Sequence, residues 1–166
     1  MRRTGSTLVE LAIAALLIGS VAYAAGRLLA YGAHTAGRQA SRSESFENAR
    51  ISLDFLVSQT ESAHMVKISV YRNTDVLKRL DLHVETHSGA HVYIFMFDNA
   101  DGRLSFGGSA DYPFTYGVNE LAAGLKEIKI TRDIDNGLLV FTVVSGDGAF
   151  ILSGAADVRY KNIAWR

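Results

Sequence analysis

Hydrophobic side chains are concentrated at the start of the chain. Residues 6–26 contain a single charged side chain, Glu10, in otherwise uncharged and mostly apolar sequence. At ~1.5 Å per residue, a helix of this length spans about 30 Å, the thickness of a bilayer core. The pattern predicts a helix that crosses a membrane once, and we assign residues 6–30 to this segment.

The helix can continue beyond the apolar segment, because no proline that would interrupt it occurs before Pro113. Apolar and small residues then recur in steps of three and four, which places them on one helix face: Phe46, Ala49, Leu53, Leu56, Thr60 and Ala63. We expect this stripe to pack on a sheet. Gly26, Gly32 and Gly37 each weaken a helix by up to about 1 kcal/mol, so we expect a bend or local unwinding near them.

After His64 the pattern changes from helical spacing to alternation, which is typical of strands. Strands are expected around Val66-Ile68-Val70, Leu80-Leu82-Val84, Val92-Ile94-Met96, Ile128-Ile130, Leu139-Phe141-Val143 and residues 150–152. The strand around Ile94 is apolar on both faces, so we expect it to be central. Asn136-Gly137 favours a turn with positive backbone angles. The prediction is an α+β fold, in which a long N-terminal helix packs on an antiparallel sheet within a globular domain of residues 31–166.

Charge and composition exclude some classes of function. Lys plus Arg and Asp plus Glu each number 17, so no overall basic field attracts nucleic acid. The chain has no cysteine, which excludes disulfides and thiol chemistry. Arg2 and Arg3 precede the apolar segment, and the positive-inside rule keeps such a terminus in the cytoplasm. We therefore expect a single-pass protein of the cytoplasmic membrane whose C-terminal domain lies outside.

The residues before and within the apolar helix resemble a known processing motif. Gly5-Ser6-Thr7-Leu8-Val9-Glu10-Leu11 follows a short basic leader, residues 1–5, and is similar to the N-terminus of type IV prepilins and pseudopilins. The resemblance implies cleavage after Gly5 by a prepilin peptidase, with Ser6 as the first mature residue and a candidate for N-methylation. It also implies a pilin-like fold, and an assembly contact between Glu10 and the terminal amine of a neighbouring subunit. Ser6 departs from the phenylalanine or methionine that is common in the family.

Two further stretches of sequence indicate which branches of this family the chain resembles. NARISLDFLVSQTESA, residues 48–63, and the ending DVRYKN, residues 157–162, are similar to W-type minor pilins and J-type pseudopilins. In the ending, Lys161-Asn162 stands in for the Arg-Asn pair of the family. The resemblance implies a subunit of a type IV pilus or a type II secretion pseudopilus, acting in filament initiation or at the tip. Its expected partners are other pilin or pseudopilin subunits, the prepilin peptidase and the membrane.

Two alternative functions stay open. One is a pseudopilin of a competence system, which takes up DNA, and only in that case is DNA an expected partner. The other is an exported binding protein or enzyme with a cleaved signal peptide, in which the alanine-rich stretch from Ala22 to Ala25 mimics a cleavage site. A mature protein that begins at Ser6 would support the pilin interpretation, and one that begins near Gly26 would support the signal-peptide interpretation.

Ligand-like side chains are explained more simply by turns. His83, Glu85, His87 and His91 have spacing compatible with a metal site, but a turn between the last two is the simpler interpretation. Residues 98–102 and 133–137 are similar to calcium loops without the complete ligand set. We therefore predict no metal and no cofactor.

No catalytic motif is found in the sequence, so we expect a protein that is not an enzyme, with no catalytic residues. The aromatic segment Tyr112-Pro113-Phe114-Thr115-Tyr116 is the remaining unusual feature. It is expected to cover the edge of its own sheet, and the alternative is binding of a partner pilin, a surface or single-stranded DNA.

Overall fold

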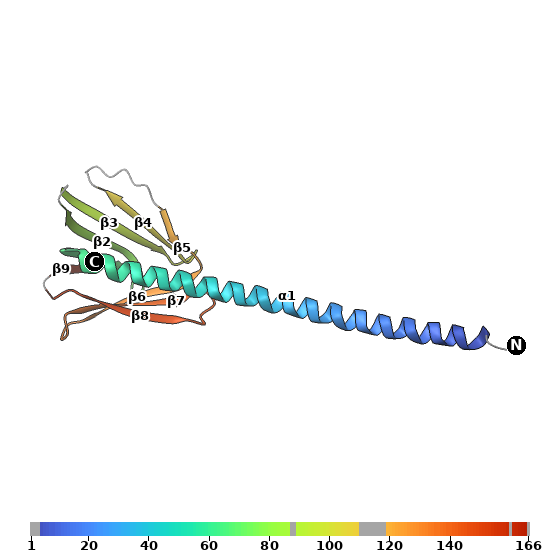
Figure 1. Cartoon of the computed structure of the whole chain (residues 1–166). Helices are drawn as coiled ribbons and strands as arrows, with labels where there is room; N and C mark the ends of the chain where they lie inside the picture. The colour runs from blue at the N-terminus through green and yellow to red at the C-terminus, as the bar shows by residue number, and fades with distance from the viewer. Residues whose placement is uncertain (1–3, 87–88, 110–118, 160, 166) are drawn as a thin grey trace. The chain divides into compact units, whose positions relative to one another are not determined.

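The computed structural model describes residues 4–86, 89–109, 119–159 and 161–165 (Figure 1). They form one helix and nine strands: α1 (Thr4–Ser62), β1 (Met65–Val70), β2 (Leu77–Thr86), β3 (Gly89–Asp98), β4 (Arg103–Ser109), β5 (Asn119–Ala122), β6 (Leu125–Asp133), β7 (Leu138–Ser145), β8 (Ile151–Asp157) and β9 (Asn162–Trp165). The chain divides into two units, Met1–Ser41 and Arg42–Arg166, and α1 contributes to both.

In the first unit, the described residues all belong to α1. From Leu8 to Tyr31 its large apolar side chains are exposed on every side, and none of the most apolar stretch is buried. This part of α1 is long and apolar enough to span a membrane. The helix is continuous through Gly26, Gly32 and Gly37, so the expectation of local unwinding is wrong. The cost of an isolated glycine, about 1 kcal/mol, is too small to interrupt a cooperative helix rich in alanine and leucine.

The strands of the second unit form two sheets, with the orders β5-β4-β3-β2-β1-β9 and β6-β7-β8. All pairs are antiparallel except β1 and β9, which run parallel. The six expected strands are confirmed, and β3 lies inside the larger sheet as expected. Sequence reasoning missed β4, β5 and β9. Two of these have four residues each, and the other contains two consecutive glycines.

The last turns of α1 lie between the two sheets (Figure 1). On one side the Phe55 ring contacts the rings of Phe95 and Phe106 edge-on, with centroids 5.8 and 5.1 Å apart. On the other side Leu53 and Val57 approach β8 so closely that a Cβ at Gly154 would lie 3.1 to 3.4 Å from them. The predicted stripe is confirmed at Ala49, Leu53, Leu56, Thr60 and Ala63, which are buried, while its first member, Phe46, is only partly buried. It packs against two sheets rather than the single sheet expected.

Lys161 ties the end of the chain to the end of α1. Its ammonium donates to the backbone oxygens of Thr60, at 2.8 Å, and of Glu61. These carbonyls belong to the last turn of a helix, which lacks intrahelical donors and carries partial negative charge. Partial burial lowers the pKa of Lys161. Asn162 then donates its backbone N–H to the oxygen of His64 at 3.3 Å and starts β9.

Lys161→Met should destabilise the second unit by about 1–2 kcal/mol, because two charge-assisted hydrogen bonds to the helix end are lost while the aliphatic stem is kept. Chemical denaturation followed by the fluorescence of the single tryptophan, Trp165 on β9, measures this change. Lys126→Met, at an exposed lysine of β6, is the matched control and should change stability by less than about 0.5 kcal/mol. Equal stability losses for the two variants would contradict the role assigned to Lys161.

Candidate functional site

The predicted processing and assembly residues lie at the start of α1. Gly5 and Ser6 have helical backbone, and the Ser6 side chain lies outside the described part of the chain, as do residues 1–3 of the leader. Glu10 lies on the exposed helix between Val9 and Leu11, which are 58% and 69% exposed. In the described part of the chain its carboxylate has no ion pair. Because four residues rise about 6 Å, this carboxylate lies roughly one helical turn from Ser6.

A tyrosine and an arginine mark the other end of the apolar segment. Arg27 donates a hydrogen bond to the Tyr23 hydroxyl at 3.3 Å, and its guanidinium lies 5.9 Å from the centre of the Tyr23 ring. Tyrosine and arginine are typical of the boundary between a bilayer core and water. Sequence reasoning missed this pair, although the i, i+4 spacing of an aromatic and a basic residue at the end of an apolar run is a visible signal.

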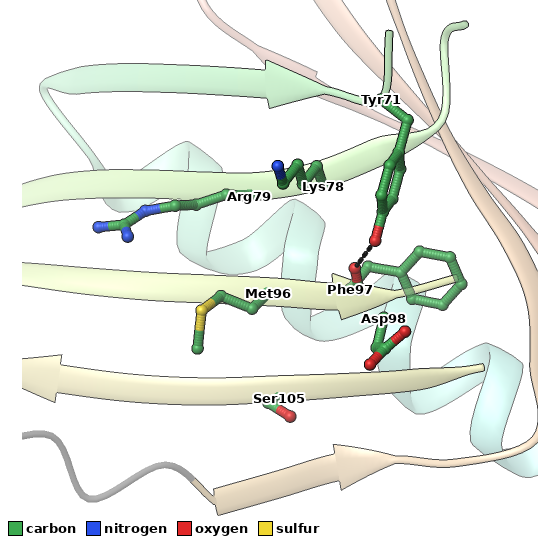
Figure 2. Close-up of a pocket in the computed structure, with 7 residues that line it drawn as sticks. All are labelled: Tyr71, Lys78, Arg79, Met96, Phe97, Asp98 and Ser105. Carbon is green, nitrogen blue, oxygen red and sulfur yellow. Dashed lines mark hydrogen bonds between the residues drawn. The ribbon is translucent and has the colours of Figure 1, made fainter. Parts of the chain in front are cut away.

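A shallow, open pocket of about 450 Å³ lies on the larger sheet (Figure 2). It is lined by Tyr71, Lys78, Arg79, Met96, Phe97, Asp98 and Ser105. The Tyr71 hydroxyl donates to the backbone oxygen of Phe97 at 2.9 Å and accepts from the N–H of Asn99 at 3.3 Å. These two hydrogen bonds fix the tyrosine ring as one wall of the pocket.

A β-bulge puts two cations on the same side of β2. Ser69 lies opposite Arg79 but Val70 lies opposite Leu77, so Lys78 is an extra residue in the register. Leu77 is therefore buried, while Lys78 and Arg79 both line the pocket.

The two cations, Lys78 and Arg79, have different interaction partners within the protein. Arg79 pairs with Asp81, at 2.7 Å from Nε to Oδ1, whereas the Lys78 ammonium lies 5.9 Å from the centre of the Tyr71 ring. The lining therefore combines these two cations with the Asp98 carboxylate and with the apolar surface of Met96, which is 37% exposed. Ser105 adds a second hydroxyl to the lining, beside that of Tyr71, and no histidine is among the described residues that line the pocket.

The candidate metal cluster is not brought together. His91 lies opposite Val84 in the β2–β3 register, which puts it on the other face of the sheet from His83 and Glu85. His87 lies outside the described residues. In the described chain no three histidine, aspartate or glutamate side chains gather as a metal site.

The His83 ring instead approaches that of His64 edge-on, with centroids 6.4 Å apart. Burial is the main cause that lowers the pKa of His83, and the charge of Lys67 adds to it.

The first aspartate of each calcium-like loop is engaged in a turn. Asp98 accepts from the N–H of Ala100 at 2.9 Å. Asp133 accepts from both the backbone and the side chain of Asn136, at 3.2 and 2.7 Å, and these bonds lower its pKa. Gly137 has a φ of 64°, as expected for the Asn-Gly turn. Such hydrogen bonds are typical of turns, and in both loops the aspartate carboxylate accepts them from residues of its own loop.

The aromatic segment of residues 112–116 lies outside the described residues, so its expected roles stay predictions. The features that bear on function are thus the start of α1, with Glu10 in an exposed apolar helix, and the pocket beside Lys78. Comparison of the chain with protein-family models, with curated proteins and with solved structures finds no match.

Proposed function

We propose that the chain is a minor pilin or pseudopilin, a filament subunit rather than an enzyme. In this proposal a prepilin peptidase cuts after Gly5, and residues 6–30 hold the protein in the cytoplasmic membrane with the C-terminal domain outside. The subunit then joins a type IV pilus or a type II secretion pseudopilus, in initiation or at the tip. The observation that carries the proposal is the position of Glu10 in an exposed apolar helix directly after a short basic leader.

The free energy of membrane insertion argues that this acid has a use. A carboxylate at the centre of a membrane helix costs roughly 2.5–3.5 kcal/mol on insertion scales, and less near the membrane surface. A plain membrane anchor gains nothing from that cost. An amine of a neighbouring subunit compensates the charge, and since both charges are costly when alone, pairing favours one axial arrangement of the helices. Cleavage after Gly5 creates such an amine at Ser6.

The division of the chain also supports the proposal. The first unit offers an exposed apolar helix, with Tyr23 and Arg27 at the end of its most apolar part. The second unit is an α+β domain with its own core around the last turns of the same helix. A subunit that leaves the membrane for a filament needs both parts: a helix that packs equally well in lipid and against other helices, and a domain that folds outside.

Mass spectrometry of the mature N-terminus tests the proposal. When the chain is produced together with a prepilin peptidase, we expect a protein that begins at Ser6. Gly5→Leu should leave the leader attached, and is the control that links the cut to this glycine. A mature protein that begins near Gly26 would instead support the signal-peptide alternative and end the pilin proposal.

A further inference from the structure

Two charged residues bound the most apolar part of α1. Glu10 lies before it and Arg27 after it, and residues 11–26 contain no acidic or basic side chain. From residue 10 to residue 27 the helix rises about 25 Å, whereas a bilayer core is ~30 Å thick. When α1 crosses a membrane, the two residues therefore do not both reach a surface, and one of the two charges is drawn into the core.

The surroundings of Arg27 match the headgroup layer of a membrane. Tyr23 and Tyr31 lie one turn before and one turn after it on the same side of the helix, and are 68% and 73% exposed. Arg27 donates a hydrogen bond to the Tyr23 hydroxyl at 3.3 Å. A guanidinium has further N–H donors, which suit the phosphate groups of phospholipids, and tyrosines are enriched at the level of the headgroups. We call these three side chains the boundary face.

The Glu10 end of the apolar segment lacks such a set of groups. No aromatic residue precedes Tyr23 in the chain. The processing site is farther from the boundary face than Glu10 is, because the helix rises about 33 Å from Gly5 to Arg27, slightly more than the thickness of the core. With Arg27 at one surface, Gly5 therefore reaches the other, and the charge drawn into the core is that of Glu10, by about 5 Å.

We propose that the boundary face binds phospholipid headgroups at the outer surface of the cytoplasmic membrane and thereby holds Glu10 inside the core. Tyr23, Arg27 and Tyr31 are positioning residues in this inference, which rests on the proposed function because it takes α1 as the membrane span. They place Gly5 at the inner surface, where a cytoplasmic peptidase reaches it. An acid kept inside the core is shielded from water, so a pairing amine of a neighbouring subunit is worth more to it than at the surface.

Single cysteines measure the depth of the helix, because the chain has none of its own. The full-length protein is placed in nanodiscs of phosphatidylethanolamine and phosphatidylglycerol and treated with a maleimide that does not enter the bilayer core. Val9→Cys reports on the inner end of the span and Ala30→Cys on the outer end. We expect the cysteine at position 30 to be labelled at least tenfold faster than the one at position 9.

Arg27→Leu should change the two labelling rates in opposite directions. Without this charge, residues 11–37 contain no acidic or basic side chain, and Glu10 moves to the headgroups because burial of a carboxylate in the core is unfavourable. The helix then slides inward, so labelling should become about fivefold faster at position 9 and about fivefold slower at position 30. A loss of folding or of insertion would instead raise both rates.

Two further variants serve as controls. Arg27→Lys should keep the native labelling rates, because a lysine also places its charge in the headgroup layer. Arg38→Leu removes another exposed arginine of α1, about 16 Å farther along the helix, and should leave both rates unchanged.

Two results would overturn the inference: labelling rates that Arg27→Leu leaves unchanged, or equal effects of Arg27→Leu and Arg38→Leu. Either result would leave the membrane span itself intact. A chain that does not enter nanodiscs would overturn both this inference and the membrane part of the proposed function. Cleavage after Gly5 is measured separately by mass spectrometry, so the two proposals can fail independently.

Discussion

Glu10→Ala should leave cleavage after Gly5 intact and should lower incorporation of the protein into filaments at least tenfold. Removing one partner of a desolvated charge pair commonly costs 2–5 kcal/mol, because the other charge is left without compensation. The same substitution makes the helix more apolar, so insertion into the membrane becomes more favourable rather than less. A loss of filaments with a stable membrane-bound protein therefore points to a missing contact between subunits and not to a failed anchor.

Fractionation measures this outcome, by comparing the amounts of the protein in sheared filaments and in membranes. Ser20→Ala is a suitable control, because Ser20 lies on the same helix and its hydroxyl donates to the backbone oxygen of Leu17, at 2.8 Å, within one turn of that helix. It should incorporate normally. Glu10→Gln keeps the size of the side chain but not its charge, and we expect it to behave like the alanine variant. Normal incorporation of either Glu10 variant would contradict the assembly role.

The parts of the fold that follow from local periodicity can be predicted from the sequence. The buried stripe of α1 repeats in steps of three and four, so its face is fixed by helix geometry alone. The central strand β3 is recognisable because Phe95 and Phe97 alternate with Ile94 and Met96, which leaves no polar face. These features depend on neighbours in the sequence, and sequence reasoning finds them.

Other parts depend on partners that are distant in the sequence. β4 contains Gly107 and Gly108, which weaken any strand pattern, yet a Cβ at Gly108 would lie 3.1 Å from the Tyr93 ring on β3. The glycine makes room for a tyrosine whose position only the folded sheet defines. β9 pairs parallel with β1, almost a hundred residues earlier in the chain. The split into two sheets likewise depends on which strands meet, and the alternation of side chains does not encode this.

The residues of the candidate site also differ in whether the local sequence reveals them. Glu10 is evident from the sequence because a lone acid contrasts with the apolar residues on both sides of it. The pocket beside Lys78 is not, since the bulge that turns this side chain outward exists only in the pairing of β1 with β2. The histidines show that spacing alone does not define a site: it is compatible with a metal site, the sequence favours a turn instead, and the β2–β3 register puts His83 and His91 on opposite faces.

Leu56→Ala should destabilise the second unit by about 2–5 kcal/mol. Leu56 is 0% exposed in the core of this unit, on the buried face of α1 between the two sheets, so truncation removes contacts and leaves a cavity. Domains are stabilised by about 5–15 kcal/mol in total, so this is a large fraction. We expect the melting temperature to fall by roughly 10 °C or more. Asp54→Ala, two residues away, breaks only an exposed ion pair with Arg50, 3.6 Å long, and should cost less than about 1 kcal/mol.

Hydrogen exchange on the same variant tests whether α1 is the shared core of both sheets. Outside the helix, backbone hydrogen bonds of the described chain also join the two sheets: an isolated bridge links Val76 to Lys129, and the N–H groups of Ile130 and Leu125 donate to the oxygens of Asp75 and Gly102, each at 2.9 Å. If α1 holds both sheets, Leu56→Ala should reduce the protection of amides in β3 and in β7 together, because each sheet loses part of the same support. Loss of protection in one sheet alone would mean that the other is stable without the helix, and that the second unit is not a single cooperative core.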